Sequence, residues 1–278
     1  MDGLPENLAR IVAEARTAQP SPAAAAAALR HMDLTSLRDE DTAESIAALL
    51  QKADQGPLGT VAAVCVYPQF IDQVVKSLKG TAVGCAAVIN FPGGKGDPRA
   101  TFEATQQAIA DGATEIDIVL DYESFLAGDR ERAEKLLNAC GAACGPDIKL
   151  KIILESAAFE NYADLADACH LAIGCGADFL KTSTGFHPKG GASLEAATVL
   201  LEAIRLSRRG GIGLKVSGGI KTVAQSATYI DLVRRMRSDV PLTRDNFRIG
   251  ASSLLDDVLR ILRPTPGMPD AVGPKADY

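Results

Sequence analysis

Apolar residues occur along this chain in short runs, separated by segments in which polar and apolar positions alternate with helical spacing. The eight runs cover residues 31–37, 60–68, 81–92, 114–122, 148–156, 177–185, 212–219 and 247–255. Most are rich in Val, Ile, Leu and Ala and nearly continuous, which is typical of strands buried on both faces of a parallel sheet. Between them, Pro98 to Asp111 and Asn161 to Gly174 have the spacing of helices. The alternation predicts an α/β fold, a (β/α)8 TIM barrel, with a doubly wound open sheet as the alternative.

The two ends of the chain differ from this repeating middle. Ser21 and Pro22 precede a run of alanines, as an N-cap and a first helical residue do, and predict a helix. We expect an N-terminal helical extension over 1–29, a single barrel domain over 30–263, and a short mobile tail rich in Pro and Gly over 264–278. The first residues lack the basic and apolar regions of a signal peptide, and no apolar stretch approaches membrane-spanning length, so we expect a cytoplasmic soluble protein.

Composition narrows the possible partners. A net charge of −6, from 35 acidic and 29 basic residues without a basic block, argues against a nucleic-acid partner. The three histidines lie far apart and the six cysteines form no CxxC pair, so we expect no metal site and predict that most cysteines are buried thiols. The expected partner is a small molecule, with neither a membrane nor a nucleic acid.

Charged residues interrupt three of the apolar runs. Asp117 lies within the fourth run, Lys181 within the sixth and Lys215 within the seventh. A charge cannot face the apolar helix layer, so these side chains should point into the barrel, and both lysines lie late in their strands, where barrel active sites are built. If the two lysines lie in neighbouring strands, their ammonium groups are about 5 Å apart. Their repulsion would lower the pKa of one lysine by about two units at an effective dielectric near 20. Burial would lower it further, giving a nucleophile at neutral pH.

An uncharged lysine beside a cation and a carboxylate suits Schiff-base chemistry on a carbonyl compound, because the iminium serves as an electron sink when a C–C bond breaks or forms. Asp117 would then relay protons. The alternative is that Asp117 and the lysines form a buried ion network that merely fills the barrel. Lys151, in the middle of the fifth run, fits that alternative better, and we expect it to pair with Asp117 or another interior acid.

A second group of residues suggests a phosphate site. Barrels often bind phosphate at the loops after strands seven and eight, where glycine N–H groups and a helix N-terminus converge. Glycines and serines end both of these runs, another glycine follows Lys181, and a lysine supplies counter-charge. The candidate phosphate-binding residues are Gly185, Gly218, Gly219, Lys221, Gly250, Ser252 and Ser253.

Several motifs together resemble a known family. MDLTSL, AAVCVYP, NFPGG, EIDIVLDY, LKIILES, DFLKTSTG, GLKVSGGIK and FRIGASSLL follow one another between Met32 and Leu255. In this order they resemble the 2-deoxyribose-5-phosphate aldolases, Schiff-base aldolases of barrel fold. The resemblance implies reversible cleavage of 2-deoxyribose 5-phosphate to acetaldehyde and glyceraldehyde 3-phosphate, in deoxyribonucleoside catabolism. It also implies a covalent lysine imine with no metal or other cofactor, and a homo-oligomer, either a dimer or a tetramer.

The resemblance also assigns individual residues. It implies that Lys181 forms the Schiff base, that Lys215 tunes the pKa of Lys181, and that Asp117 assists proton transfer. Asp33, in MDLTSL, is expected to orient groups near the site, and Cys65, in VCVYP, to line the pocket.

The C-terminus and two departures from the family pattern add further expectations. Tyr278 matches a tail tyrosine that in some members reaches the site and helps exchange the proton at the enamine carbon. Phe186 stands where some members carry lysine, and Lys221 where many carry arginine. These departures predict that backbone N–H groups and a point charge hold the phosphate, rather than bidentate contacts.

Three other functions stay open. Asp147 and Lys149 have the Asp-x-Lys spacing of a phosphate-binding decarboxylase, but they stand at the start of the fifth run, the wrong end of a barrel for chemistry. A sugar-phosphate-binding barrel without catalysis would act as a sensor. A Schiff-base aldolase of the same family acting on a different aldehyde pair would share every motif above.

Overall fold

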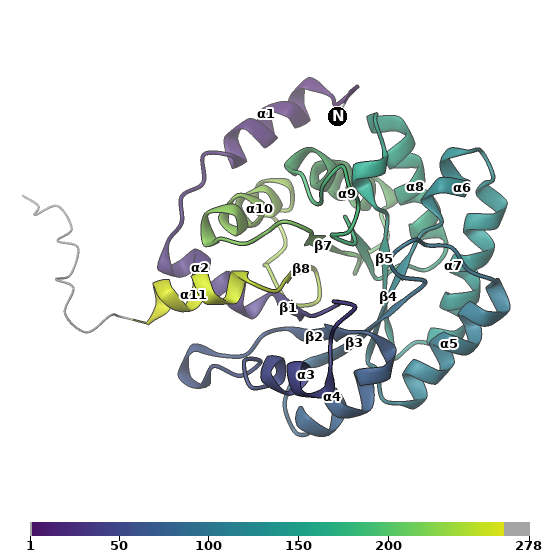
Figure 1. Ribbon diagram of the computed structural model, residues 1–278. Helices are drawn as coiled ribbons and strands as arrows, with labels where there is room; N and C mark the ends of the chain where they lie inside the picture. The colour runs from purple at the N-terminus through teal and green to yellow at the C-terminus, as the bar shows by residue number, and fades with distance from the viewer. Residues whose placement is uncertain (1, 264–278) are drawn as a thin grey trace, which may run out of the picture.

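The predicted barrel is present. The computed structural model describes residues 2–263 and shows eight parallel strands in sequence order, closed by the pairing of β8 with β1 (Figure 1). Each of the eight predicted apolar runs contains one strand. The strands are β1 (Met32–Thr35), β2 (Ala63–Val66), β3 (Gly84–Ile89), β4 (Glu115–Val119), β5 (Lys149–Ile153), β6 (Phe179–Lys181), β7 (Gly213–Ser217) and β8 (Phe247–Ala251).

Helices surround the barrel and begin where capping residues place them. Ser21 accepts a hydrogen bond from the Ala24 N–H at 3.1 Å and caps α2, as its sequence predicts. The two predicted helical segments are also found, one starting at Pro98 and the other directly after its N-cap Asn161. The helices are α1 (Glu6–Ala15), α2 (Pro22–Arg30), α3 (Ala43–Leu50), α4 (Ile71–Ser77), α5 (Pro98–Ala110), α6 (Tyr122–Leu126), α7 (Arg130–Cys144), α8 (Tyr162–Gly174), α9 (Leu194–Ser207), α10 (Val223–Met236) and α11 (Leu254–Leu262).

The N-terminal segment is packed onto the barrel. Helix α1 runs across the outside of α9 and α10, with Leu8, Val12 and Ala15 buried (Figure 1). The backbone of Asp2 accepts a hydrogen bond from the Tyr162 N–H at 2.8 Å, which ties the chain start to α8. Helix α2 packs against α10 and α11. The predicted tail, 264–278, with Tyr278, lies outside the described residues.

The core has two parts of different chemistry. Between strands and helices it is apolar, and side chains such as Ile116 and Ile118 are fully buried there. Inside the barrel a set of charged residues is buried, beside a small apolar cluster that includes Leu37 and Val88. All six cysteines are buried as free thiols, which confirms their predicted role as core residues. Within residues 2–263 no helix is both long enough and apolar enough to span a bilayer.

The loops that follow β6 and β7 are packed backbone to backbone. Gly218 has φ +89° and lies between Gly185 and Gly191. A Cβ on Gly191 would stand 2.3 Å from the Gly218 carbonyl oxygen, far inside van der Waals contact. The Ala192 N–H also donates to the carbonyl of Ser217 at 3.0 Å. Only glycine fits these positions, so each loop holds the other at the mouth of the barrel.

Candidate active site

The two predicted lysines lie side by side at the C-terminal end of the barrel. Lys181 is the last residue of β6 and is in register with Lys215 of β7, which in turn is in register with Arg248 of β8. Residues in lateral register point to the same face of a sheet, so the barrel brings three basic side chains into one row in its interior. The placement of Lys181 and Lys215 is the one that their positions within the apolar runs predict.

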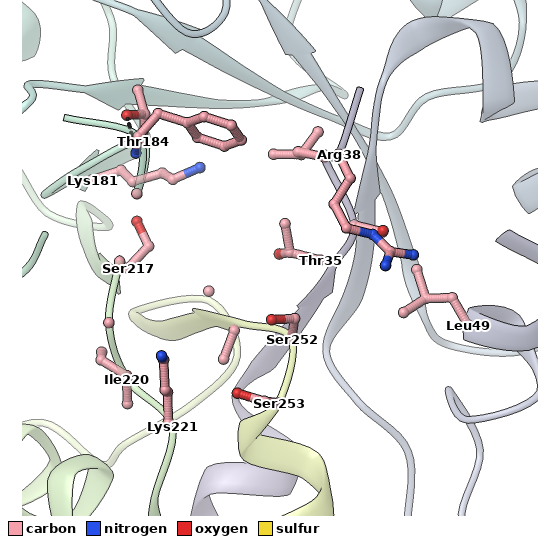
Figure 2. Close-up of a pocket in the computed structure, with 18 of the residues that line it drawn as sticks. Thr35, Arg38, Leu49, Lys181, Thr184, Ser217, Ile220, Lys221, Ser252 and Ser253 are labelled. Atoms are coloured by element: carbon pink, nitrogen blue, oxygen red, sulfur yellow. Dashed lines mark hydrogen bonds between the residues drawn. The ribbon is translucent and has the colours of Figure 1, made fainter. Parts of the chain in front are cut away.

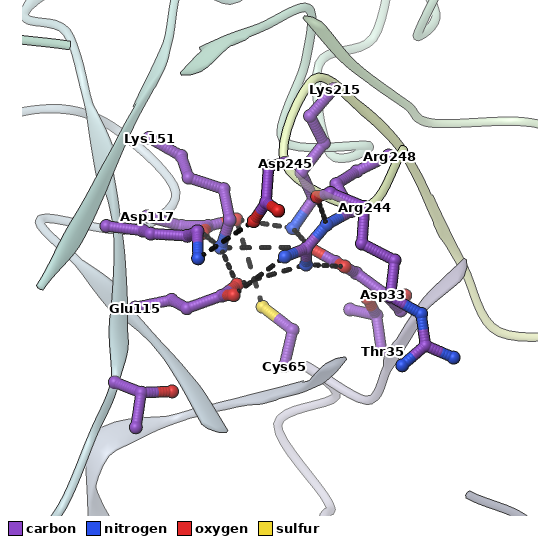
Figure 3. Close-up of polar contacts among 12 residues, drawn as sticks. Asp33, Thr35, Cys65, Glu115, Asp117, Lys151, Lys215, Arg244, Asp245 and Arg248 are labelled. Carbon is purple, nitrogen blue, oxygen red and sulfur yellow. Dashed lines mark hydrogen bonds and ion pairs between the residues drawn. The ribbon is translucent and has the colours of Figure 1, made fainter. Parts of the chain in front are cut away.

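Asp117 joins the lysines. Its Oδ2 lies 2.7 Å from the Nζ of Lys181. The same oxygen lies 2.7 Å from the Nζ of Lys215, and Oδ1 lies 2.6 Å from the Nζ of Lys151 (Figure 3). Asp117 and Lys151 face each other in the register of β4 and β5. The expected pairing of Lys151 with Asp117 is therefore confirmed.

The charged contacts extend beyond these residues. Asp33 Oδ2 lies 2.6 Å from the Nζ of Lys215, and Asp33 Oδ1 lies 2.6 Å from Nη1 of Arg248. Arg248 also donates to both carboxylate oxygens of Glu115, at 2.8 and 3.2 Å, and Glu115 Oε2 lies 2.6 Å from the Nζ of Lys151 (Figure 3). The ion network that the sequence suggested as an alternative to a catalytic site is present, and Lys181, at its edge, also lines a cavity.

The two neighbouring lysines are not equivalent. Burial and the charge of Lys215 lower the pKa of Lys181, although Asp117 opposes the shift. Burial also disfavours the charged form of Lys215, but Asp117 and Asp33 outweigh burial and raise the pKa of Lys215. The proton is therefore held by Lys215, and Lys181 is the amine that is more easily neutral.

A cavity of about 490 Å³ opens above this pair (Figure 2). In Figure 2 the Lys181 and Lys221 side chains extend into it from β6 and from the loop after β7. Thr35, Arg38 and Phe186, which were not predicted as site residues, also line it. The cavity brings together all the candidate phosphate-binding residues, Gly185, Gly218, Gly219, Lys221, Gly250, Ser252 and Ser253.

Two residues expected at or near the site, Asp33 and Cys65, lie beneath the cavity. Asp33 is fully buried and bonded to Lys215 and Arg248, so it orients basic side chains and does not border the cavity. Cys65 is also fully buried, with its Sγ 4.0 Å from Asp117 Oδ2, and the structure places it in the floor below Lys181, not in the cavity wall. In β1 the residue that borders the cavity is Thr35, which lies on the same face two positions nearer the C-terminal end of the strand, so Asp33 lies one layer deeper. Tyr278, the third residue expected near the site, is beyond the described part of the chain.

Glu155 is a buried acid that the sequence did not single out. It follows β5 in a left-handed conformation, with φ +52°, and its Oε2 accepts hydrogen bonds from the N–H, at 3.1 Å, and the hydroxyl of Thr184. Its Oε1 is buried without a hydrogen-bond partner within residues 2–263. Burial raises the pKa of Glu155 despite the hydrogen bonds from Thr184. Thr184 lines the cavity three residues after Lys181, so Glu155 anchors the loop that carries the KTSTG motif.

Phe186 lines one side of the cavity and belongs to a row of three aromatic side chains. Phe186 is 51% exposed and packs edge-on against Phe91 with 5.2 Å between ring centroids, and Phe91 packs in the same way against Tyr67 at 6.0 Å. Arg38, across the cavity in Figure 2, is held by Asp41 at 3.2 Å. The cavity therefore has apolar surface on one side and hydrogen-bonding groups on the other.

Known proteins share this sequence and fold. The model of the DeoC/LacD family aldolases matches residues 27–258. The deoxyribose-phosphate aldolase of Agrobacterium fabrum (strain C58) is 40% identical over 240 residues, which cover 86% of this chain and 92% of that one.

Two solved structures extend the likeness to three dimensions. The apo form of a candidate deoxyribose-phosphate aldolase from Toxoplasma gondii ME49 superimposes with a TM-score of 0.78 at 26% identity, covering 87% of this chain and 96% of that one. A tetrameric deoxyribose phosphate aldolase from Aeropyrum pernix has a TM-score of 0.71 at 23% identity, covers 90% and 95% of the two chains, and shares the fold.

Proposed function

The chain belongs to the DeoC/LacD family of aldolases, and on that premise we propose that it is a deoxyribose-phosphate aldolase. The reaction is the reversible cleavage of 2-deoxyribose 5-phosphate to acetaldehyde and glyceraldehyde 3-phosphate. The observation that carries the proposal is a lysine of lowered pKa, Lys181, facing a cavity with Lys215 and Asp117 directly behind it.

The first step uses Lys181 as a nucleophile. Its neutral amine adds to the C1 aldehyde of the open-chain sugar, and the resulting carbinolamine loses water to give an iminium ion. Lys215, charged and in register beside it, favours the neutral amine at the outset. In this proposal the protein's own lysine supplies the electron sink, so the reaction uses no cofactor.

Carbon–carbon cleavage follows. When a base removes the proton of the C3 hydroxyl, the electron pair of the C2–C3 bond moves into the iminium, which leaves an enamine on Lys181 and releases glyceraldehyde 3-phosphate. The enamine then takes up a proton at C2, and water hydrolyses the iminium to free acetaldehyde and the amine. Asp117 Oδ2 contacts the Nζ of both lysines at 2.7 Å, which supports its predicted part in moving protons beneath the substrate.

The opposite side of the cavity suits the phosphate. Lys221 provides a positive charge, and Ser252 and Ser253 stand at the start of α11, where hydroxyl and backbone N–H groups meet the positive end of a helix. Phe186 contributes no charge. Apart from Lys181, the two other basic residues that line the cavity, Arg38 and Lys52, pair with acids. In this proposal Lys221 and uncharged donors therefore hold the phosphate. This arrangement supports the prediction made from Phe186 and Lys221.

The alternative functions find less support. Asp147 is exposed, and Lys149 pairs with Asp245 at 3.1 Å at the start of β5, the opposite end of the barrel from the cavity. Neither residue of that pair lines the cavity. A barrel that only binds a sugar phosphate has no need for two adjacent lysines of which one, Lys181, has a lowered pKa and the other, Lys215, a raised pKa.

Reductive trapping tests the proposal. The protein is incubated with 2-deoxyribose 5-phosphate, reduced with borohydride, and digested for mass spectrometry. We expect an adduct on Lys181 that is absent in Lys181→Leu and retained in Lys149→Leu, a partly exposed lysine at the other end of the barrel. An adduct on another lysine, or tight sugar-phosphate binding with neither adduct nor turnover, would contradict the assignment. Trapping with other aldehydes distinguishes a different aldehyde pair.

Two expectations from the family resemblance stay predictions. Light scattering coupled to size-exclusion chromatography would check the expected dimer or tetramer. Tyr278→Phe would check the tail tyrosine, since loss of proton exchange at the enamine carbon with an unchanged Lys181 adduct is the result expected for a residue that only transfers that proton.

A further inference from the structure

Six of the buried charged residues form a closed ring. Asp117 contacts Lys151, Lys151 contacts Glu115, Glu115 contacts Arg248, Arg248 contacts Asp33, Asp33 contacts Lys215, and Lys215 contacts Asp117 again (Figure 3). Acids and bases alternate around the ring, three of each, so the ring is electrically balanced by itself. Each of the six side chains is at most 4% exposed, so solvent cannot supply counter-charge.

Lys181 stands outside this balance. It contacts the ring at one point, Asp117 Oδ2, which Lys215 already occupies at the same distance of 2.7 Å. A protonated Lys181 is therefore a fourth base against three acids, at a position that is only 3% exposed. Charge that is buried without compensation is strongly disfavoured, so the proton most easily lost is the one on Lys181.

We propose that Arg248 and Glu115 are positioning residues that control how readily Lys181 acts as a nucleophile, because each fixes one unit of charge in the ring. The inference rests on the proposed function of Lys181. Neither residue contacts Lys181 or the cavity, and Arg248 is two strands away in the row that runs from Lys181 through Lys215. Their influence passes through the charge balance and not through contact with the substrate.

The other groups around Lys181 leave this balance in place. Six of the other strands each bring charged or titratable side chains into the interior, and β3 brings the apolar Ala86 and Val88. The charged or titratable residues are Asp33 (β1), Cys65 (β2), Glu115 and Asp117 (β4), Lys151 (β5), Lys215 (β7) and Arg248 (β8). Burial raises the pKa of Cys65, so this thiol stays neutral. Glu155, beyond β5, is bonded to Thr184 and is unchanged in every variant described below, so it does not contribute to the differences between them.

The inference predicts opposite effects from two substitutions at the same distant pair. Arg248→Met removes a positive charge, so the three acids are then balanced by three bases, one of which is Lys181. Lys181 is therefore expected to keep its proton to higher pH. Glu115→Gln removes a negative charge, so Lys181 is expected to lose its proton at lower pH. A unit charge roughly 10 Å away, two strand spacings, at an effective dielectric near 20 shifts a titration by about one pH unit.

The measurement is the rate at which Lys181 is reductively methylated by formaldehyde and cyanoborohydride as a function of pH, read by peptide mass spectrometry on the full-length protein. This readout needs no turnover. The midpoint is the pH at which this rate is half of its maximum. The acid limb of the pH profile of kcat/KM should have the same midpoint. We choose unphosphorylated 2-deoxyribose as the substrate for that profile because a phosphate ester itself titrates near pH 6. At pH 1 unit below the wild-type midpoint, Arg248→Met should react roughly tenfold more slowly.

Two further variants separate charge from shape. Arg248→Lys keeps the charge and should keep the wild-type midpoint, and the double variant Arg248→Met with Glu115→Gln restores the excess of one base and should return close to it. Shifts in the same direction for both single variants, or a midpoint in Arg248→Lys equal to that of Arg248→Met, would overturn the inference. If a single variant fails to fold, the double variant and Arg248→Lys still test the inference, because a midpoint clearly displaced from that of wild type in either of them would contradict it.

The outcome is separable from that of the proposed function. If wild-type protein forms no borohydride-trapped adduct with 2-deoxyribose 5-phosphate while the methylation midpoints move as expected, the proposed aldolase is wrong and the charge balance stands. If the adduct forms on Lys181 and the midpoints do not move, only the inference about Arg248 and Glu115 is wrong.

Discussion

Basic residues occur in two places in this molecule and behave differently in each. Inside the barrel, Lys215 lies within 2.7 Å of two carboxylates and is fully buried. At the cavity rim, Arg38 and Lys52 pair with single acids at 3.2 and 3.9 Å and are more than half exposed. Buried charges are coupled to one another and to the fold, whereas exposed pairs are screened and contribute little. In the function proposed here, the interior sets the reactivity of the Lys181 amine, and the basic residues at the rim attract an anionic ligand.

The largest effect is expected from removing the acid that joins the lysines. Asp117→Asn leaves three buried ammonium groups short of a partner and should lower the free energy of unfolding by about 3–5 kcal/mol. Urea denaturation at pH 7 measures it. The matched control is Asp167→Asn, which breaks the exposed pair with Arg130 and should leave stability unchanged. Equal stabilities of Asp117→Asn and wild type would show that the ring contributes nothing to folding.

The pH dependence sharpens the same experiment. Lys151, Lys181 and Lys215 hold the pKa of Asp117 well below its usual range, although burial opposes them. A carboxyl whose pKa is depressed on folding stabilises the protein above its unfolded pKa, and this stability is lost as pH falls through the folded value. The difference between wild type and Asp117→Asn should therefore be complete at pH 7 and shrink below about pH 4.

An intermediate effect is expected at Glu155, which lies between interior and rim. Glu155→Ala removes both hydrogen bonds to Thr184 and should lower the free energy of unfolding by about 2 kcal/mol, whereas Glu155→Gln keeps an acceptor oxygen and should change it by at most about 1 kcal/mol. Because the pKa of Glu155 is raised by burial, wild type should lose stability as pH rises through that pKa, and Glu155→Gln should not. Identical pH profiles for wild type and Glu155→Gln would contradict this.

The smallest effect is expected at the rim. Lys221→Gln removes one charge-assisted contact and should raise KM for 2-deoxyribose 5-phosphate about tenfold with little change in kcat, corresponding to about 1.4 kcal/mol. The effect should weaken at high salt and be absent with unphosphorylated 2-deoxyribose. Lys189→Gln, an exposed lysine that does not line the cavity, is the control. An equal rise in KM for both sugars would mean that Lys221 does not bind the phosphate.

The barrel and the lysine pair could be predicted because both depend on local pattern. Continuous apolar runs identify strands buried on both faces, and a charge inside such a run has only the barrel interior to face. Lys181 and Lys215 followed from that reasoning, and so did the pairing of Lys151 with Asp117. Positions within a run also indicated which end of the barrel each residue would occupy.

The rest of the site depends on contacts that no local pattern shows. Glu115 and Arg248 interrupt their runs as Lys215 does, but they stand near the strand starts, where charge suggests a structural role. That Arg248 contacts both Asp33 and Glu115 follows only from closure of the barrel, which places β8 beside β1 and opposite β4. Cys65 is a different case. Its motif predicted that it lies near the site, but the motif could not show that Cys65 lies below the cavity and does not line it.

The glycine contact between the loops after β6 and β7 bears on how new specificities could be engineered here. The backbones of Gly191 and Gly218 are in close contact. A single loop transplanted from a relative would therefore pack poorly against the loop that was not exchanged. The two loops form one exchangeable module and should be grafted together. Diversity libraries would do better to vary Phe186, whose half-exposed side chain can change without disturbing that contact.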